Sequence, residues 1–327
     1  GRAKLTVYRD AVKRLVFDDT LAAYRGEVNR KWINIADNFS GVIGGGVGTL
    51  ALLFLGDDEL GASAADILEN IVKTNEITVG LLGSDGGYFE GVSYANYMLE
   101  NMCSELELLW KMCGTDYALS AAEGLQNAGA FLGYMQTPSG NIGYSDTDTT
   151  VVKSSVPAYL AYRYGKIPAA AAYRVTSKEC GYIDDLSTLY YYDRAVDIYG
   201  APDLGDIQED SYFDSVKSGM LRDSFNTAAP TVAGFHADRN GLAHDHIDAG
   251  TFTFEAEGVK WAYDLGNDSY GISDYFGKTG YRLYRKNAEG HNVVVINPTE
   301  YSAGKENYYG QKTDGKAHLV EYKSVPK

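Results

Sequence analysis

Cysteine is scarce in this chain, which has three in 327 residues and no Cys-x-x-Cys pair. A thiolate metal motif or redox motif of that spacing is therefore excluded. Cys103 and Cys113 fall on one predicted helix, too far apart along it to form a disulfide, so we expect buried thiols. The cysteines leave the redox compartment open.

Long apolar runs and an excess of basic residues are also absent. No segment approaches the roughly 20 apolar residues that a membrane-spanning helix needs, and the longest, residues 47–55, is interrupted by Gly48. Lys and Arg number 29 against 44 Asp and Glu, which gives a net charge of -15. Such a surface repels polyanions at long range, so we predict neither a membrane nor a nucleic-acid partner. An anionic substrate would need a local basic cleft.

The chain does contain enough apolar material for a large core, and a surplus of tyrosine. A hydrophobic content of 45% over 327 residues can bury the cores of two structural units. Tyrosine numbers 27 against 11 phenylalanines. Phenol rings suit walls that stack on sugars and hydrogen-bond their hydroxyls, but ordinary core packing explains them equally well.

Apolar residues recur at helical spacing through the first 200 residues. The connections between these segments are short and carry glycine and aspartate stop signals, so neighbouring helices should pack as antiparallel hairpins. The predicted helices are residues 5–23, 42–55, 62–73, 94–112, 117–132, 157–164, 168–173 and 183–199.

After about Ala201 the pattern changes to short runs rich in Val, Phe, Thr and Tyr, which predict strands. The predicted antiparallel strands are residues 251–256, 259–263, 293–296 and 317–322. Helices followed by strands predict a multidomain α+β chain, with a helical domain at 1–200 and a β domain at 201–327. Nothing follows the last predicted strand to complete a sheet, so we expect the chain to stop within that domain.

The densest polar cluster, residues 244–248, reads His-Asp-His-Ile-Asp and leads directly into a predicted strand. Alternate residues of an extended chain share a face, so the two histidines and Asp248 can project into one site. Asp264 closes the next strand, and His291 opens another. Histidine and carboxylate ligands on neighbouring strands, with water in an open position, suit zinc. The alternative is that the histidines are exposed or lie in the core.

Two further clusters combine polar and aromatic residues. In residues 85–97, glycines form a flexible turn into a helix that carries Tyr94 and Tyr97 on one face, directed into a cleft. Alternatively, these aromatic side chains pack on the next helix. In residues 29–39, Asn, Arg and Trp suit a sugar carboxylate and ring. Alternatively, Asp37 or Asn38 caps a helix.

Together the three clusters resemble the heparinase II/III-like polysaccharide lyases. Residues 244–252, His-Asp-His-Ile-Asp-Ala-Gly-Thr-Phe, are similar to the family's His-x-His-x-Asp-Ala-Gly-x-Phe. Residues 286–293, Lys-Asn-Ala-Glu-Gly-His-Asn-Val, are similar to its Ala-His-Asn-Thr-Val, and residues 85–97 to its Asp-Gly-x-x-x-Glu-Gly-x-x-Tyr. The resemblance implies an (α/α) toroid, here incomplete, followed by an antiparallel β-sandwich, here partial. It also implies β-elimination on a uronic-acid polysaccharide and a periplasmic or secreted location.

The resemblance also implies roles for single residues. Tyr94 and His244 match the family's catalytic tyrosine and histidine. Asn38, or else Asn34, lies where the family places the group that neutralises the substrate carboxylate. The sequence departs from the family there, with Arg-Lys-Trp at 30–32 in place of Asn-Asn-His or Asn-Asn-Trp. The implied metal ligands, which hold a structural zinc in some members, are His246, Asp264 and His291, so the cofactor is Zn2+ or none. Candidate contacts to an anionic polysaccharide or oligosaccharide are Trp32, Asn34, Glu90, Tyr97, Arg239, Tyr284 and Arg285, although the two arginines suit surface salt bridges equally well.

β-Elimination needs these residue types because the proton that is removed lies next to a carboxylate. That carbon acid is too weak while the carboxylate stays charged, so Asn, His or Arg donors must stabilise the developing enolate. A phenol with the usual pKa of about 10 is a poor base, unless nearby cations or His244 lower the pKa of Tyr94. His244 can remove the proton of one uronate epimer while Tyr94 protonates the leaving oxygen.

Two alternatives come from other functional classes. An α/α-toroid glycoside hydrolase needs two opposed carboxylates, for which Glu90 with Asp85 or Asp146 are candidates. A non-catalytic carbohydrate-binding scaffold would keep the fold and use the histidines only to hold a structural metal. The oligomeric state is not predicted.

Overall fold

A computed structural model describes residues 2–147, 154–165, 186–201, 207–225, 227, 229–295 and 310–325. Its contacts group the chain into two compact units. The first comprises Gly1–Leu82 and Tyr97–Leu125, and the second comprises Gly83–Asn96 and Gln126–Lys327. The predicted helix at 168–173 and Cys180 lie outside the described residues. The division into domains at 1–200 and 201–327 stays a prediction.

The first unit is helical. Its helices are α1 (Arg2–Val12), continued through a π-helical turn into α2 (Asp18–Tyr24), then α3 (Asn38–Phe54), α4 (Gly61–Val79) and the part of α5 (Val92–Cys113) from Tyr97 onward. The side chain of Asp37 caps α3 by accepting a hydrogen bond from the Phe39 amide at 2.9 Å. Residues of α2, α3, α4 and the segments beside them form one core, made of Phe17, Leu21, Trp32, Val47, Ala51, Leu60, Ala64, Ile67 and Ile71.

Two predictions concern the helices: the burial of their cysteines and the absence of a membrane-spanning segment. Cys103 is buried as predicted, but Cys113, at the C-terminal end of α5, is exposed, so that prediction is wrong. The end of a helix that projects beyond its packing partners leaves its last side chains in solvent. Within the described residues, no helix is both long enough and apolar enough to cross a membrane.

Glycines on α3 allow the backbone of α5 to approach closely within the first unit. A Cβ atom added at Gly45 would lie 2.6 Å from the carbonyl carbon of Asn101 and 2.8 Å from the amide nitrogen of Met102. On the neighbouring position, Gly46, nothing lies within 4 Å of such an atom. The packing of the two helices therefore depends on the absence of a side chain at Gly45.

Replacing Gly45 by alanine is expected to lower the free energy of unfolding by about 1–3 kcal/mol, because backbone atoms cannot rotate away from the new methyl group. Gly46→Ala is the matched control and should raise that free energy by about 0.5–1 kcal/mol, since alanine is the better helix former. Urea denaturation of both variants measures the difference. Equal stabilities would contradict the close approach of α3 and α5.

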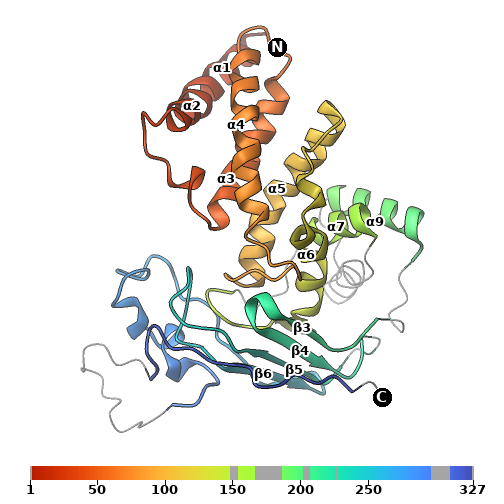
Figure 1. Ribbon diagram of the computed structural model, residues 1–327, viewed down its shortest axis with the longest axis vertical. Coiled ribbons are helices and arrows are strands. Elements are labelled where there is room, and N and C mark those ends of the chain that lie inside the picture. The colour runs from red at the N-terminus through yellow and green to blue at the C-terminus, as the bar shows by residue number, and fades with distance from the viewer. Residues whose placement is uncertain are drawn as a thin grey trace. The chain divides into compact units, whose positions relative to one another are not determined.

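The second unit combines helices with two sheets. Its helices are α6 (Glu123–Tyr134, from Gln126 onward), α7 (Val156–Tyr164) and α9 (Leu186–Tyr199), and β1 (Gln136–Thr137) and β2 (Gly140–Asn141) form a small hairpin. The main sheet has five antiparallel strands in sequential order, β3 (Ser211–Phe213), β4 (Ser218–Arg222), β5 (Val232–His236), β6 (Thr251–Ala256) and β7 (Val259–Ala262) (Figure 1). The predicted α+β class is confirmed.

The two faces of the main sheet differ in burial. Along β6, Thr251, Thr253 and Glu255 are buried, whereas Phe252 is 50% exposed and Phe254 is 36% exposed. This alternation follows from the two-residue period of a strand. Leu221 of β4 and Val259 of β7 are also exposed. One face therefore belongs to the core of the second unit, and the other presents apolar side chains.

Two predicted strands are wrong. Residues 293–295 form no strand, and Val294 is 81% exposed. The Asn292 side-chain amide donates to the carbonyl oxygens of Phe252 and Tyr263, at 2.9 and 3.3 Å. Residues 317–322 likewise form no strand, although Lys316 makes an isolated bridge to Arg239. The predicted strands at 251–256 and 259–263 correspond to β6 and β7.

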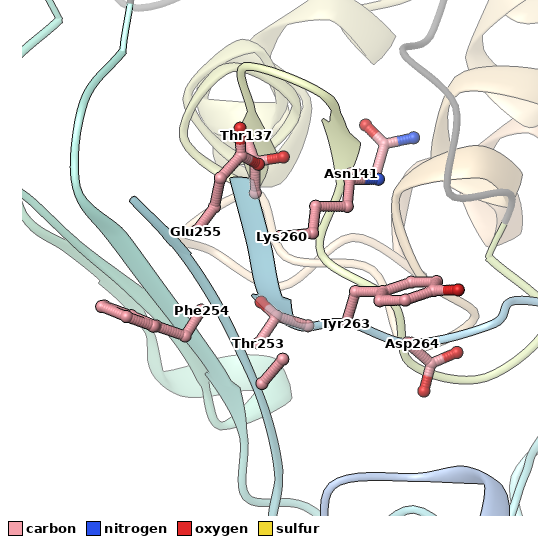
Figure 2. A pocket seen from close by; sticks show the side chains of 9 residues that line it. Thr137, Asn141, Thr253, Phe254, Glu255, Lys260, Tyr263 and Asp264 are labelled. Carbon is pink, nitrogen blue, oxygen red and sulfur yellow. The ribbon is translucent and has the colours of Figure 1, made fainter. Parts of the chain in front are cut away.

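A pocket lies between the small hairpin and the end of the main sheet. Figure 2 shows the side chains that line it, with Tyr263 and Asp264 following β7. Glu255 is buried in this pocket and accepts a hydrogen bond from the Ser139 hydroxyl at 2.5 Å. The lining consists of Thr137, Asn141, Thr253, Phe254, Glu255, Lys260, Ala262, Tyr263 and Asp264.

Candidate functional site

Four segments of the second unit bring Tyr94, His244 and the predicted metal residues together. The first turn of α5 supplies Tyr94, and the loop between β5 and β6 supplies residues 244–248. The loop after β2 supplies Asp146, and the long stretch after β7 supplies residues 264–291. The segments are far apart in sequence, so the site exists only in the folded unit.

Tyr94 and His244 are in direct contact. Their rings stack with centroids 3.9 Å apart and planes inclined by 27°. The Tyr94 hydroxyl shares a short hydrogen bond with the Tyr270 hydroxyl. The ring of Phe276 packs edge-on against His244, with centroids 5.4 Å apart. A phenol and an imidazole, the two groups predicted to exchange protons with substrate, thus share one location.

The backbone at His244 is unusual. Its φ of 58° lies in the left-handed region, which few residues other than glycine adopt. Its carbonyl oxygen accepts a hydrogen bond from the Asp146 amide at 2.9 Å. A left-handed residue persists when its surroundings fix it, as this contact does. The conformation directs the His244 side chain toward Tyr94 and Asp146.

Asp146 is the centre of the hydrogen-bond network. Its Oδ2 accepts from Nδ1 of His244 at 2.9 Å, and its Oδ1 accepts from Nε2 of His246 at 2.8 Å and from the Tyr275 hydroxyl. Burial raises the pKa of Asp146, but the hydrogen bonds from the two histidines and the positive charge of Lys286 outweigh it, so the net pKa lies well below its usual range. Asp146 is therefore a carboxylate at neutral pH.

Lys286 is a buried cation beside this network. Its ammonium group lies 4.2 Å from the centroid of the Tyr275 ring and 5.4 Å from that of Tyr281. Burial lowers the pKa of Lys286, and the neighbouring carboxylates Asp146, Asp245 and Asp248 oppose that shift. The aromatic faces and the acidic groups thus offset part of the cost of burying its charge.

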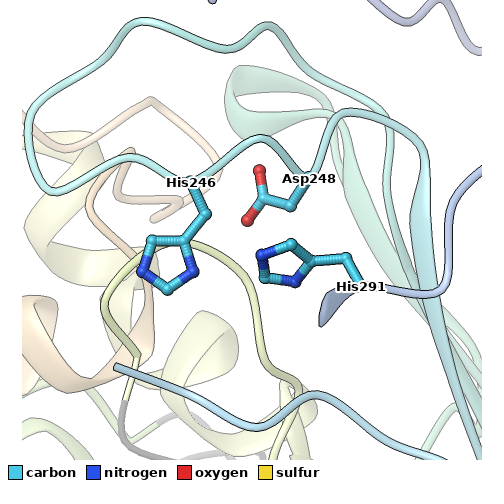
Figure 3. Close-up of side chains that lie close together, drawn as sticks. All are labelled: His246, Asp248 and His291. Carbon is cyan, nitrogen blue, oxygen red and sulfur yellow. The ribbon is translucent and has the colours of Figure 1, made fainter. Parts of the chain in front are cut away.

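A candidate metal centre includes His246, the second histidine that contacts Asp146. Figure 3 shows the imidazoles of His246 and His291 and the carboxylate of Asp248 turned toward a common point. One possible ligand atom from each lies within 4.8 Å of the others, and all three residues are buried. The two imidazole centroids are 5.1 Å apart. Two histidines and a carboxylate are a donor set that zinc accepts.

The hydrogen bonds of these three residues support that fit. The buried atoms His246 Nδ1, Asp248 Oδ1 and His291 Nε2 have no hydrogen-bond partner among the described residues. The remaining polar atom of each side chain is held by the protein. His246 Nε2 contacts Asp146, Asp248 Oδ2 accepts from the Ser145 amide at 2.6 Å, and His291 Nδ1 contacts Asp264. Buried polar atoms without partners are costly, and a metal ion would satisfy all three.

Asp264, the carboxylate that the resemblance implies as a ligand, has other contacts in this structure. Its Oδ2 accepts a short hydrogen bond from Nδ1 of His291, and its Oδ1 accepts from the Gly266 amide at 2.8 Å. Burial raises the pKa of Asp264, but the contact with His291 outweighs it and the net pKa is lowered. Asp264 thus orients His291, and the carboxylate that faces both histidines is Asp248.

The other predicted contact residues of the second unit lie in varied surroundings. The Arg285 guanidinium donates to the carbonyl oxygens of Leu265 and Asn267, at 2.7 and 3.1 Å, and so braces the stretch after β7. Tyr284 is 59% exposed and Arg239 is exposed. Glu90 is fully buried and accepts from the Tyr88 hydroxyl at 2.6 Å.

The remaining four predicted residues belong to the first unit. Trp32 lies in its apolar core, with its ring packed edge-on against Tyr24 at a centroid distance of 6.0 Å. Asn38 is buried at the start of α3. Asn34 is exposed, and Tyr97 is 45% exposed. Burial of Trp32 explains its apolar role without a sugar, whereas Asn34 and Tyr97 are accessible.

Sequence reasoning missed part of the network. Tyr270, Tyr275 and Lys286 had no predicted role, and Asp146 entered only as a possible hydrolase carboxylate. The available signals were weak. The stretch 263–284 is rich in tyrosine, and Lys286 opens the motif that ends in His291. The contacts of the two tyrosines join residues far apart in the sequence, Tyr270 with Tyr94 and Tyr275 with Asp146.

The carboxylates proposed for a glycoside hydrolase are all engaged by protein groups. Asp85 accepts hydrogen bonds from the amides of Gly87 and Ser215, at 3.0 and 2.9 Å, and so fastens its glycine turn to the segment after β3. Glu90 contacts Tyr88, and Asp146 contacts the two histidines. Each of these carboxylates therefore has a hydrogen-bond partner within the protein.

Comparison with known proteins finds similarity in structure and not in sequence. No protein-family model and no curated protein matches the chain. A crystal structure of heparinase III aligns with a TM-score of 0.60 and 15% identity, over 88% of this chain and 42% of that one. A second heparinase III aligns at 0.52 with 17% identity, over 78% and 36%. A mutant of the heparan sulfate lyase HepC from Pedobacter heparinus aligns at 0.50 with 12% identity, also over 78% and 36%.

These identities establish a shared fold and nothing finer. The chain spans 42% of the length of the first of these proteins and 36% of the other two. The similarity therefore concerns only part of each of these proteins. The described residues of this chain contain the Tyr94–His244 pair and the candidate metal centre.

Proposed function

We propose that this chain is the part of a polysaccharide lyase that cleaves a uronic-acid-containing polysaccharide by β-elimination. The observation that carries the proposal is the stacked pair of Tyr94 and His244, with His244 held by Asp146. Three of the structures with the same fold are named as a heparinase III or a heparan sulfate lyase. Fold and side-chain geometry thus favour the same reaction class.

The proposed reaction breaks a C–H bond and a C–O bond and forms a C=C bond in the uronate. His244 takes the proton next to the substrate carboxylate through Nε2, because its Nδ1 donates to Asp146. Tyr94 gives its hydroxyl proton to the leaving glycosidic oxygen. For the opposite epimer, Tyr94 can perform both transfers. Burial and its contact with Tyr94 raise the pKa of Tyr270, so Tyr270 stays protonated and keeps its hydrogen bond to the Tyr94 hydroxyl.

The substrate carboxylate must be neutralised for this chemistry to proceed. Asn38, or else Asn34, remains our proposal for that task, and Tyr97, Tyr284 and Arg239 remain proposed substrate contacts. The exposed side chains of Asn34, Tyr97 and Tyr284 are compatible with binding. The proposed substrate is an anionic polysaccharide or oligosaccharide, and the proposed location is periplasmic or secreted.

We further propose that the metal centre holds a structural zinc. His246 and His291 would ligate it, together with Asp248 or Asp264. The ion would fix His246, and through Asp146 the position of His244. Proton transfer itself is assigned to Tyr94 and His244.

For the architecture, we propose that the main sheet is one layer of an antiparallel β-sandwich and that the helices belong to an (α/α) toroid. The apolar outer face, with Leu221, Phe252, Phe254 and Val259 exposed, supports a second layer, because apolar faces of this kind are usually covered. The boundary near residue 200 remains part of this proposal.

Ultraviolet absorbance of the unsaturated uronate tests the function. The full-length protein, supplied with zinc, is assayed on heparan-type, alginate-type and other uronic-acid polysaccharides. We expect the absorbance to rise on at least one substrate. New reducing ends without a rise in absorbance would instead establish a hydrolase. Binding without any cleavage would favour the carbohydrate-binding scaffold.

A further inference from the structure

Asp146 joins two histidines to which the proposed function gives different tasks. Its Oδ2 is 2.9 Å from Nδ1 of His244, and its Oδ1 is 2.8 Å from Nε2 of His246 and also contacts the Tyr275 hydroxyl. The carboxylate is 2% exposed, so water does not compete for it. One buried carboxylate therefore serves three donors at once.

The chemistry of a carboxylate determines the proton positions on both rings. An ionised carboxylate only accepts hydrogen bonds, so each of its partners must donate. His244 then carries its proton on Nδ1, and His246 carries its proton on Nε2. In neutral rings, the lone pairs lie on the opposite atoms, Nε2 of His244 and Nδ1 of His246. The second of these is the buried atom without a partner that faces Asp248 and His291.

We propose that Asp146 is a positioning residue that fixes opposite tautomers in the two histidines. It leaves Nε2 of His244 ready to accept a proton and Nδ1 of His246 ready to ligate a metal. The part that concerns His244 rests on the proposed lyase function. The part that concerns His246 rests only on the metal centre.

The backbone around Asp146 keeps the carboxylate in place. The Asp146 amide donates to the His244 carbonyl at 2.9 Å, and the preceding amide, of Ser145, donates to Asp248 at 2.6 Å. The loop after β2 is thus bound to the histidine loop through both its main chain and its side chain. Rotation of the Asp146 carboxylate would break contacts on both sides, which is why a single residue can control both rings.

The substitution Asp146→Asn tests the proposal with little change in shape. An amide has one accepting oxygen, so its NH2 group must face one of the two histidines and forces that ring into the other tautomer. Nitrogen-15 NMR of histidine-labelled protein reports the tautomer of each ring, and the chain has only five histidines to assign. We expect the zinc-supplied wild type to show Nδ1–H at His244 and Nε2–H at His246, and the variant to invert at least one.

Activity gives a second readout. If the inverted ring is His244, kcat should fall by about 10⁴-fold with KM little changed, as expected when a catalytic histidine is held in the wrong tautomer. If it is His246, zinc affinity should fall instead, by about 10–100-fold. Asp245→Asn is the matched control, because this buried carboxylate accepts from the backbone amides of Gly241 and Leu242 and not from an imidazole. It should leave both tautomers unchanged.

The outcomes separate this proposal from the proposed function. A wild type without lyase activity, whose tautomers are nevertheless as stated and change in Asp146→Asn, would refute the lyase and support the role of Asp146. A folded Asp146→Asn protein with both tautomers unchanged would overturn the role of Asp146. If that variant does not fold, the wild-type spectrum decides, because Nε2–H at His244 or Nδ1–H at His246 contradicts the proposal.

Discussion

Tyr94→Phe is expected to lower kcat for β-elimination by about 10²–10⁴-fold, the usual contribution of a general acid or base. Phenylalanine keeps the ring that stacks on His244, so the fold and much of substrate binding should survive. Only the hydroxyl, with its contact to Tyr270, is lost. Initial rates of ultraviolet absorbance on the preferred polysaccharide give kcat and KM separately, and thermal unfolding verifies the fold.

His244→Ala should cause a loss of similar size, and the double variant should lose little more than either single variant. Groups that act as one unit in a reaction are strongly non-additive. Tyr199→Phe is the matched control, since this tyrosine is 53% exposed at the end of α9. Full activity in Tyr94→Phe would show that the Tyr94 hydroxyl takes no part in the reaction. Multiplied losses in the double variant would indicate two independent roles.

Removing either histidine of the metal centre is expected to abolish stoichiometric zinc binding. Each of the variants His246→Ala and His291→Ala keeps two of the three converging side chains, and two side chains are too few to hold the ion in a closed site. Unfolding temperature should fall with zinc affinity, and a chelator should lower the wild type to the level of the variants. Zinc content by atomic absorption and thermal unfolding measure both effects.

The same measurements distinguish the two candidate carboxylates. If Asp248 is the ligand, Asp248→Asn should lose zinc, whereas Asp264→Asn, which only disturbs the contact to His291, should weaken binding by about 10–100-fold. The reverse order would favour the ligand set implied by the family resemblance. His318→Ala is the control, because His318 is exposed. Equal zinc content in all variants would argue against this centre.

Local sequence patterns predicted the regular elements well where burial decides them. Residues 251–256, a short run rich in Thr and Phe, form β6 as predicted, and one of its faces belongs to the core. The continuous run of valines at 293–295 predicted a strand that does not form, and the Asn292 side chain donates to the carbonyl oxygens of Phe252 and Tyr263 beside it. Whether a strand has a neighbouring strand to pair with depends on the tertiary structure, so a segment of a few residues cannot predict it.

The sequence indicated candidate site residues where they carry a motif and gave little indication of those defined by contacts. The His-x-His spacing indicated His244 and His246, although His244 lies in a turn with a left-handed backbone and not in an extended chain. Asp146 has no such spacing, and its role depends on partners roughly a hundred residues away along the chain. The choice between Asp248 and Asp264 is similar, because it depends on which carboxylate is already engaged by His291.

The stretch from the end of β7 to His291 contains only short 3-10 turns, Gly280–Arg282, Tyr284–Lys286 and Ala288–Gly290. Such a segment gains little from backbone ladders and loses much conformational entropy when it becomes ordered. A zinc ion held by His246 and His291 would act as a crosslink that closes the segment 246–291, which contains this stretch, and restricts the unfolded chain in the manner of a disulfide. The zinc site would thus give a protein with few cysteines a crosslink, and the stability that it adds would depend on the zinc concentration around the protein.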